Sequence, residues 1–173
     1  MPQTTSPKGK PEHELDAPPW LRVESTLMAA AKAIRDAYDE RLAHLGLNLS
    51  LASLLAYTDE YGAVSQTRVA QHLGQGRAVT GSNIDRLASL GLVERRPDPD
   101  DRRVWLVAVT EEGRATAEQV KAVDFELRAE LRVGVSREER QMLATLLLRL
   151  QQNLDNNLRD SSKNSTTTAR GTA

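Results

Sequence analysis

The segment 65–110 constrains the fold of this chain more than any other part of the sequence. Two short helical patterns, 65–73 and 77–90, are separated by a turn that contains two glycines. Two short apolar runs, 92–96 and 104–109, then flank a polar loop rich in proline, aspartate and arginine. Because glycine ends helices and short β-branched runs form strands, this order predicts a helix, a turn, a second helix and a two-stranded ribbon. A helix-turn-helix followed by such a ribbon, called a wing, is typical of proteins that bind duplex DNA.

Longer helical patterns lie on both sides of this segment. Apolar residues spaced three or four apart predict a helix from about Pro18 to Gly46 and two more over about 111–132 and 136–159. Their apolar stripes are wider than one short winged domain can cover. Association of two chains through these helices would bury the surplus, and a monomer whose helices pack on each other is the alternative.

These patterns predict a mainly α-helical fold with a small β-wing. We expect a single domain over 18–160, in which a winged helix-turn-helix at about 48–109 is embedded in a helical dimerisation bundle made of about 18–46 and 111–160. Polar residues mark the expected helix starts: Asn48 or Ser50, Ser65, Thr110, and Ser136 with Glu139 as a capping box.

The two ends differ in composition from this domain. Residues 1–17 are rich in proline, lysine, glycine and glutamate, and residues 161–173 are rich in serine, threonine and asparagine. Such segments bury too little apolar surface to order themselves, so both are predicted to be disordered tails.

Composition excludes several classes of protein. The chain has no cysteine, which excludes disulfides, thiolate metal sites and cysteine redox switches. It has neither an apolar run of the ~20 residues that span a bilayer nor an apolar secretory signal at its start, so we expect a cytoplasmic protein without a membrane partner. A nucleophile–base pair, a phosphate-binding glycine loop and a metal-ligand cluster are all lacking, and the acidic run 98–101 does not have the spacing of a calcium loop. We therefore predict no enzyme, no cofactor and no metal.

The cations of the central segment are unusual in type rather than in number. The seven cations between 65 and 109 are all arginine. The same segment has five acidic residues, so its net charge is +2, while that of the whole chain is −1. Arginine suits bidentate contacts with phosphate and guanine better than lysine does. The alternative is that these arginines are solvated or paired with the nearby aspartates.

At this point the sequence resembles the MarR family of transcription regulators. The wing carries that family's hallmark Asp-x-Arg as Asp101 and Arg103, followed by Val109-Thr110, and the resemblance is dense over residues 65–113. It implies a homodimer that binds a palindromic double-stranded DNA operator, usually represses transcription, and is often released from DNA by a small-molecule effector. The chain departs from the family at Gly76-Arg77-Ala78, where Ser or Thr and a later Pro are usual, and its lack of cysteine excludes the peroxide-sensing branch.

Candidate DNA-binding residues follow from helix docking and from this resemblance. The first turns of the second helix face base edges in helix-turn-helix docking, so we expect base or phosphate contacts there and a close backbone approach at Gly81. By resemblance one arginine of the wing enters the minor groove, and Asp101 pairs with Arg103 to fix the ribbon. Alternation places Arg95 and Arg96 on opposite faces, so at most one faces DNA. The complete set is Arg68, Arg77, Thr80, Gly81, Ser82, Arg86, Arg95, Arg96, Asp101, Arg102 and Arg103.

The resemblance also implies an effector pocket where the first, second and fifth helices meet the DNA-binding lobe. Its candidate residues are Tyr38, Arg41, His44, Tyr57 and Trp105. A packing role for Trp105 and a solvated or capping role for His44 are the alternatives. A winged-helix module that contacts proteins and has no operator of its own is the alternative function, and the arginines of the wing argue against it.

Overall fold

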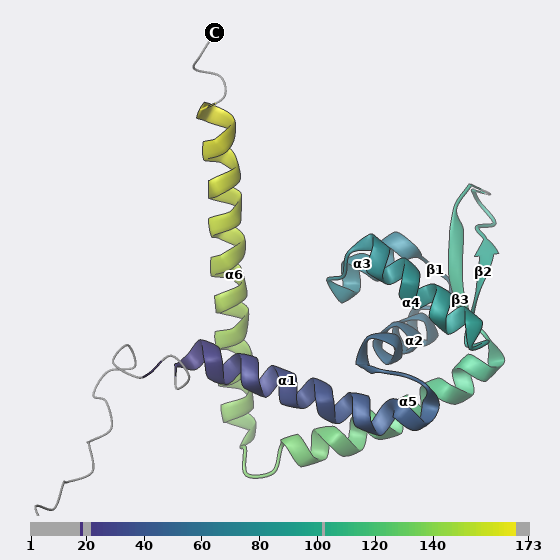
Figure 1. Cartoon of the computed structure of the whole chain (residues 1–173), viewed down its shortest axis with the longest axis horizontal. Coiled ribbons are helices and arrows are strands. Elements are labelled where there is room, and N and C mark those ends of the chain that lie inside the picture. The colour runs from purple at the N-terminus through teal and green to yellow at the C-terminus, as the bar shows by residue number, and fades with distance from the viewer. Residues whose placement is uncertain (1–17, 19–21, 102, 169–173) are drawn as a thin grey trace, which may run out of the picture. The chain divides into compact units, whose positions relative to one another are not determined.

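The computed structural model describes residue 18 and residues 22–101 and 103–168, with side chains described to residue 156 (Figure 1). The chain divides into two compact units, Met1–Leu127 and Arg128–Ala173. In chain order the elements are α1 (Val23–Leu42), the 3-10 helix η3 (Ala43–Leu45), α2 (Leu49–Tyr61), β1 (Val64–Ser65), α3 (Gln66–Leu73), α4 (Arg77–Ser89), β2 (Val93–Pro97), β3 (Trp105–Val109), α5 (Glu111–Leu131) and α6 (Arg137–Thr168).

Local side-chain chemistry sets most helix boundaries of the first unit. The side chain of Asn48 accepts a hydrogen bond from the Leu51 amide at 2.9 Å and so caps α2. Ser65 caps α3 through the Arg68 amide at 3.4 Å, and Thr110 Oγ1 caps α5. These predicted caps are confirmed.

The first helix begins later than predicted. It starts at Val23 rather than near Pro18, and residues 19–21 lie outside the described residues. A proline disfavours the helical conformation of the residue before it, so Pro19 opposes helix at Pro18. At the other end Gly46 adopts the left-handed conformation, with φ of 68°, and terminates η3 as predicted.

The ribbon is part of a three-stranded antiparallel sheet with the order β1-β3-β2. Val93 pairs with Val109 and Pro97 with Trp105, while the two residues of β1 pair with Val107 and Leu106. The prediction of two strands was therefore incomplete, because a strand of two residues is too short to produce a recognisable alternation. Pairing of β1 ties the start of α3 to the central strand.

The core of the first unit lies between the sheet and helices α2, α3 and α4 (Figure 1). Residues that are fully enclosed come from each of these elements. They include Leu54, Leu55, Val69, Ile84, Leu87 and Val107, all 0–2% exposed. The first half of α5 adds Ala117 and Val120 to this core. Burial of this apolar surface is the main stabilising contribution to the lobe, and it fixes the positions of α3, α4 and the sheet.

The second unit consists of the end of α5, a turn at Gly134 and helix α6. Ser136 Oγ accepts from the Glu139 amide at 3.1 Å, and the Glu139 carboxylate accepts from the Ser136 amide at 2.8 Å, which confirms the capping box. The helix continues to Thr168, whereas it was predicted to end near Arg159 and to give way to a disordered tail at 161. No glycine or proline interrupts 137–168, so nothing in that stretch breaks the helix.

The two predicted tails are otherwise untested. Residues 1–17 and 169–173 lie outside the described residues. Within the part of the chain that is described, no helix has the length and apolar character needed to cross a bilayer.

Candidate nucleic-acid interface

Helices α3 and α4 form a helix-turn-helix whose turn is fixed by hydrogen bonds. Gly74 ends α3 in the left-handed conformation with φ of 61°. The side chain of Gln66 donates to the Arg77 carbonyl at 3.1 Å, and the Asn83 amide group donates to the side chain of Gln75 at 3.2 Å. These bonds hold the first turns of α4 against α3 and against the turn. The start of α4 therefore has a defined position in the lobe.

Helix α4 presents a polar face to solvent and an apolar face to the core. Arg77, Ser82 and Arg86 are exposed, while Ile84 and Leu87 are completely buried. Among the described residues no acid forms an ion pair with either of these two arginines. The exposed face can therefore meet the edges of bases or phosphates without first breaking a salt bridge.

The expectation that Thr80 contacts DNA is wrong. Its side chain is 0% exposed, and its hydroxyl donates to the Gly76 carbonyl at 3.1 Å within the helix. Thr80 lies four residues before Ile84 and so belongs to the same buried stripe. That spacing was available in the sequence and would have placed Thr80 in the core.

Gly81 meets another part of the protein rather than an open surface. A Cβ atom at this position would lie 3.1 Å from Nε2 of Gln66, which is tighter than ordinary van der Waals contact. The absence of a side chain at Gly81 thus leaves room for Gln66, whose side chain bonds the Arg77 carbonyl. The expected close approach of DNA to Gly81 stays a prediction.

The wing turn is organised by two aspartates that cap backbone amides. Asp98 Oδ1 accepts from the Asp100 amide at 2.9 Å, and Asp101 Oδ1 accepts from the Arg103 amide at 3.0 Å. Asp101 thus holds Arg103 through its backbone, not through its guanidinium group as we expected. The Arg103 side chain remains exposed, and no described acid pairs with it. Arg102 lies outside the described residues.

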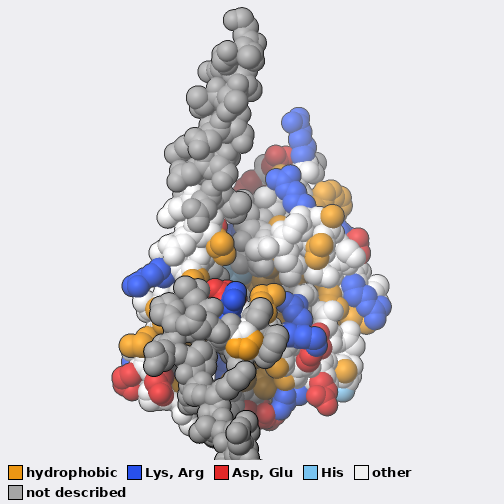
Figure 2. Space-filling view, turned by 60° about the vertical axis from the view of Figure 1, so that its left-hand side comes forward, with side chains coloured by type: hydrophobic (Ala, Val, Ile, Leu, Met, Phe, Trp, Pro, Cys, Tyr) orange, Lys and Arg blue, Asp and Glu red, His pale blue; other side chains and the backbone are white. Residues whose placement is uncertain are grey.

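Arg95 and Arg96 lie on opposite faces of β2 and each has an acidic partner. Arg95 pairs with Asp85 of α4 at 2.7 Å, and the Arg96 Nε donates to Glu94 at 2.6 Å. The alternative that the arginines are paired with nearby acids therefore holds for these two. Arg68 on α3 is exposed and has no ion-pair partner among the described residues. Figure 2 shows basic side chains, with acidic and apolar ones between them, on the upper right of the face it displays.

A shallow pocket of about 390 Å³ lies beside the turn of the helix-turn-helix. Its lining residues come from α3, the turn and the first residue of α4. They are Thr67, Ala70, Gln71, Gly74, Gln75, Gly76 and Arg77. The hollow includes Arg77, so it adjoins the exposed start of α4.

The effector pocket stays a prediction, and the structure shows the contacts of its candidate residues. The Tyr38 hydroxyl donates to Asp124 at 2.7 Å, which connects α1 with α5. Arg41 donates to the Ala37 carbonyl at 3.3 Å, and His44 is exposed with its Nδ1 at 2.7 Å from the Arg41 carbonyl. These contacts give no support to the assignment of Trp105 to the pocket. It pairs with Pro97 on the wing, and its side chain is 57% exposed.

Tyr57 is buried and takes part in an aromatic cluster that sequence reasoning missed. Its ring stacks on the ring of His72 at a centroid distance of 4.1 Å, and Tyr61 lies 4.7 Å from Tyr57. The cluster joins α2 to α3 through contacts that contribute stability beyond simple burial. Only the spacing of Tyr57 and Tyr61, one helical turn apart, was visible in the sequence.

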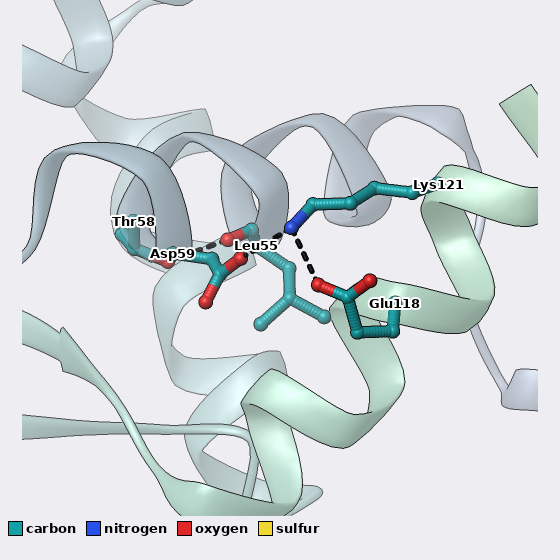
Figure 3. Close-up of polar contacts among 5 residues, drawn as sticks. All are labelled: Leu55, Thr58, Asp59, Glu118 and Lys121. Atoms are coloured by element: carbon teal, nitrogen blue, oxygen red, sulfur yellow. Dashed lines mark hydrogen bonds and ion pairs between the residues drawn. The ribbon is translucent and has the colours of Figure 1, made fainter.

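A polar bridge joins α2 to α5 on another side of the lobe (Figure 3). Lys121 Nζ lies 2.9 Å from Asp59 Oδ2 and 2.7 Å from Glu118 Oε1. The hydrogen bonds that Lys121 donates to Glu118 and then to Asp59 raise the pKa of Lys121 above its usual value. Asp59 is mostly covered, with 14% of its side chain exposed. Because Asp59 belongs to α2 and Lys121 to α5, this pair links the DNA-binding lobe to the helix that leaves it.

The fold and the exposed face of α4 define a winged helix-turn-helix protein. Residues 45–104 of the chain match the model of the MarR family. A curated relative, the uncharacterized HTH-type transcriptional regulator YdgJ of Bacillus subtilis (strain 168), is 33% identical over 108 residues, which are 62% of this chain and 64% of that protein. The chain thus spans slightly less than two thirds of this relative's length.

Solved structures of transcription regulators have the same architecture. CouR from Rhodococcus jostii RHA1, determined with bound p-coumaroyl-CoA, matches with a TM-score of 0.69 and 26% identity over 80% of this chain and 94% of that one. A probable transcriptional regulator from Pseudomonas aeruginosa matches with a TM-score of 0.63 and 26% identity over 75% of this chain and 99% of that one.

Proposed function

We propose that this protein is a sequence-specific DNA-binding transcription regulator. The observation that carries the proposal is the first part of α4, which projects Arg77 and Ser82 to solvent while Gln66 holds the helix in place. An exposed recognition helix with a fixed position can enter the major groove, and the exposed Arg103 of the wing can reach the neighbouring minor groove. Arg68 and Arg86 complete the proposed contact surface as phosphate partners.

The active form is proposed to be a homodimer on a palindromic operator. Large apolar residues of α6 are exposed in the single chain, including Leu143, Leu146, Leu150 and Leu154 at 43–65%. A second copy would cover this stripe, and the two recognition helices would then meet successive major grooves about 34 Å apart. α1 and α5 are the other helices assigned to dimerisation.

The dimer is tested by placing a charge on the apolar stripe. Leu146→Glu should convert the protein to a monomer in sedimentation equilibrium, because a carboxylate cannot be buried in an apolar interface without a partner. Gln152→Glu adds the same charge six residues further along the helix, away from the stripe, and should leave the dimer intact. A wild-type chain that is strictly monomeric at micromolar concentration would contradict the proposal.

We further propose that the protein represses transcription and that a small-molecule effector relieves the repression. Support comes from the solved structure of CouR, a protein of similar fold that is bound to p-coumaroyl-CoA. An effector that binds better to a dimer with the wrong spacing of its lobes would lower the population of the DNA-competent state. The experiment is an operator-binding titration with and without candidate ligands.

DNA binding is tested by fluorescence anisotropy with the duplex upstream of the protein's own gene. Specific binding should tighten as the salt concentration falls, because each neutralised phosphate releases counterions. Arg77→Ala then separates two kinds of contact. Loss of a base contact would relax preference at one operator position by about 1–3 kcal/mol, and loss of a phosphate contact would weaken all sequences equally. Binding indifferent to salt and sequence would favour the protein-interaction module instead.

A further inference from the structure

Trp105 stands on the core-facing side of the sheet but beyond the end of the core. In β3 successive side chains point to opposite faces of the sheet, so Trp105, Val107 and Val109 share one face. Val107 and Val109 are 2% and 6% exposed, whereas Trp105 is 57% exposed. Its strand partner Pro97 is also exposed. The wing therefore carries an apolar pair, an indole and a proline ring, that the described part of the chain leaves largely uncovered.

This face of the wing is turned toward α4. Arg95 lies on it, directly opposite Val107, and its guanidinium reaches Asp85 of α4 at 2.7 Å. On the other side of β3, the last pair with β1 joins Leu106 to Ser65. The next residue of that segment is Gln66, whose side chain bonds the first residue of α4. Trp105 thus lies one register step past β1, on the side of the sheet where the recognition helix begins.

The position of Trp105 along the wing also matters. A single residue, Val104, separates it from Arg103, the exposed cation of the wing turn. A duplex that accepted α4 in its major groove and Arg103 in its minor groove would carry one sugar–phosphate strand between the two elements. The uncovered face with Trp105 and Pro97 lies on that path. An indole suits this position because its ring packs on apolar deoxyribose and its N–H can donate to a phosphate oxygen.

We propose that Trp105 is a DNA-contacting residue of the wing, which packs its indole against the sugar–phosphate backbone between the major and minor grooves. The proposal rests on the DNA-binding function proposed above and adds a contact that is apolar and independent of charge. Pro97 supports the ring from the neighbouring strand. The exposed Arg103 attracts the phosphate backbone toward this part of the wing, and the indole gives it a surface to pack on.

The sequence supplies a direct probe, because its two tryptophans are Trp20 and Trp105. In a Trp20→Phe variant, Trp105 is the only tryptophan and its fluorescence reports on the wing. Titration with a duplex that binds in anisotropy should change this emission and protect the indole from acrylamide quenching. A duplex of the same length without specific affinity, at equal concentration, should do neither. Emission and quenching that remain constant while anisotropy shows full binding would overturn the proposal.

Affinity provides the second measurement. Trp105→Ala should weaken binding about tenfold, which is the scale of one aromatic packing contact with nucleic acid. The slope of affinity against salt should stay the same, because no charge is removed. Trp105→Phe should recover most of the affinity, since it keeps a flat ring. Because the side chain is mostly exposed, both variants should melt close to the wild type. Such melts would show that a loss of affinity does not come from unfolding.

The outcomes distinguish this proposal from the function on which it rests. If wild-type protein binds its duplex and Trp105→Ala binds equally well, the proposed contact between Trp105 and DNA is wrong, while the proposed DNA-binding function is still supported. If the wild type binds no duplex above the non-specific level, the function itself is wrong and the contact falls with it. If Trp105 is protected by a protein partner but not by DNA, the face is a protein-docking surface and the proposal is overturned.

Discussion

The backbone carbonyl of Leu92 occupies the space in which Gly113 would otherwise carry a side chain. A Cβ atom at Gly113 would lie 1.9 Å from the Leu92 oxygen and 2.8 Å from Cγ2 of Val109. The same carbonyl accepts a hydrogen bond from the Thr110 amide at 3.1 Å, and the Thr110 hydroxyl donates to the Gly91 carbonyl at 2.7 Å. The first turn of α5 is therefore locked to the start of the wing.

Gly113→Ala should destabilise the lobe severely. The new methyl group would meet backbone atoms, which cannot rotate away as the end of a side chain can. The expected loss is about 3 kcal/mol, at the upper end of what overpacking costs, measured by urea denaturation. Gly134→Ala offers a comparison, because no atom lies within 4 Å of a Cβ there and only the positive φ of 73° opposes the change. Equal stability of Gly113→Ala and wild type would contradict the packing.

Thr80 and Ser82 should respond differently to loss of a hydroxyl group. Thr80→Val removes a buried bond to the Gly76 carbonyl and should lower stability by about 1 kcal/mol, while the folded protein keeps its DNA affinity. Ser82→Ala alters an exposed position and should weaken DNA binding without lowering the melting temperature. Thermal melts and anisotropy titrations of both variants decide the matter. A Thr80→Val protein that is as stable as wild type but poor in DNA binding would restore Thr80 to the interface.

The wing turn should depend on the carboxylate of Asp101 as an acceptor. Asp101→Ala removes the bond to the Arg103 amide, so the wing turn should lose its fixed conformation and DNA affinity should fall. Asp101→Asn keeps an oxygen acceptor and should retain more affinity, although it also removes a negative charge. Amide hydrogen exchange at Arg103 measures the turn directly. Faster exchange in the alanine variant than in the asparagine variant is expected, and equal rates would exclude this capping role.

The bridge between α2 and α5 should depend on pH at its alkaline end. The pKa of Lys121 is raised above its usual value by Glu118 and Asp59, so its contribution is complete below the pKa of an unfolded lysine and is lost as pH rises through the raised value. Asp59→Asn should lower the melting temperature at neutral pH and flatten this alkaline dependence. Glu118→Gln should also flatten the alkaline dependence, because Glu118 is the larger cause of the raised pKa. It is the comparison for the melting temperature at neutral pH, since Glu118 lies on the same helix as Lys121 and does not connect two elements. A larger loss of melting temperature in Glu118→Gln than in Asp59→Asn would refute the bridge.

The start of α6 should loosen in acid. The Ser136 amide and then its hydroxyl hydrogen-bond Glu139 and lower its pKa, so the capping contribution is present above the pKa of an unfolded glutamate and is lost as pH falls through the lowered value. The protection factors of the Ser136 and Glu139 amides, which compare the observed exchange rate with the intrinsic rate at each pH, should fall over that acidic range in the wild type. Glu139→Gln keeps a neutral acceptor, so its exchange protection should not change across that acidic range.

Features that depend on neighbouring residues were predicted well from the sequence. Asn48, Ser65, Thr110 and Ser136 cap their helices because capping is a bond between residues two or three apart. The order of helices and the wing followed from the same local patterns. The two-residue strand β1 was missed, since its existence depends on β3, more than 40 residues away in the chain.

The candidate site was predicted only where position on an element decides exposure. Arg77 and Ser82 are exposed as expected. The spacing of Thr80 from Ile84 could have excluded it from the predicted DNA-binding residues. The environment of Trp105 could not be predicted in this way. Strand alternation gives its face, but only the tertiary structure shows that the core stops at Val107. The stack of His72 on Tyr57 joins two helices and has no local signal.

The short strand β1 prevents a hinge motion between the wing and the helix-turn-helix. Its two residues are bonded to the central strand and lead directly into α3, so the wing cannot swing relative to the helix-turn-helix without breaking sheet bonds. Each lobe would thus hold the recognition helix α4 and the wing at one fixed separation. A binding site whose groove spacing differs would have to be met by bending of the DNA or by exchange of side chains, since a hinge inside the lobe is not available.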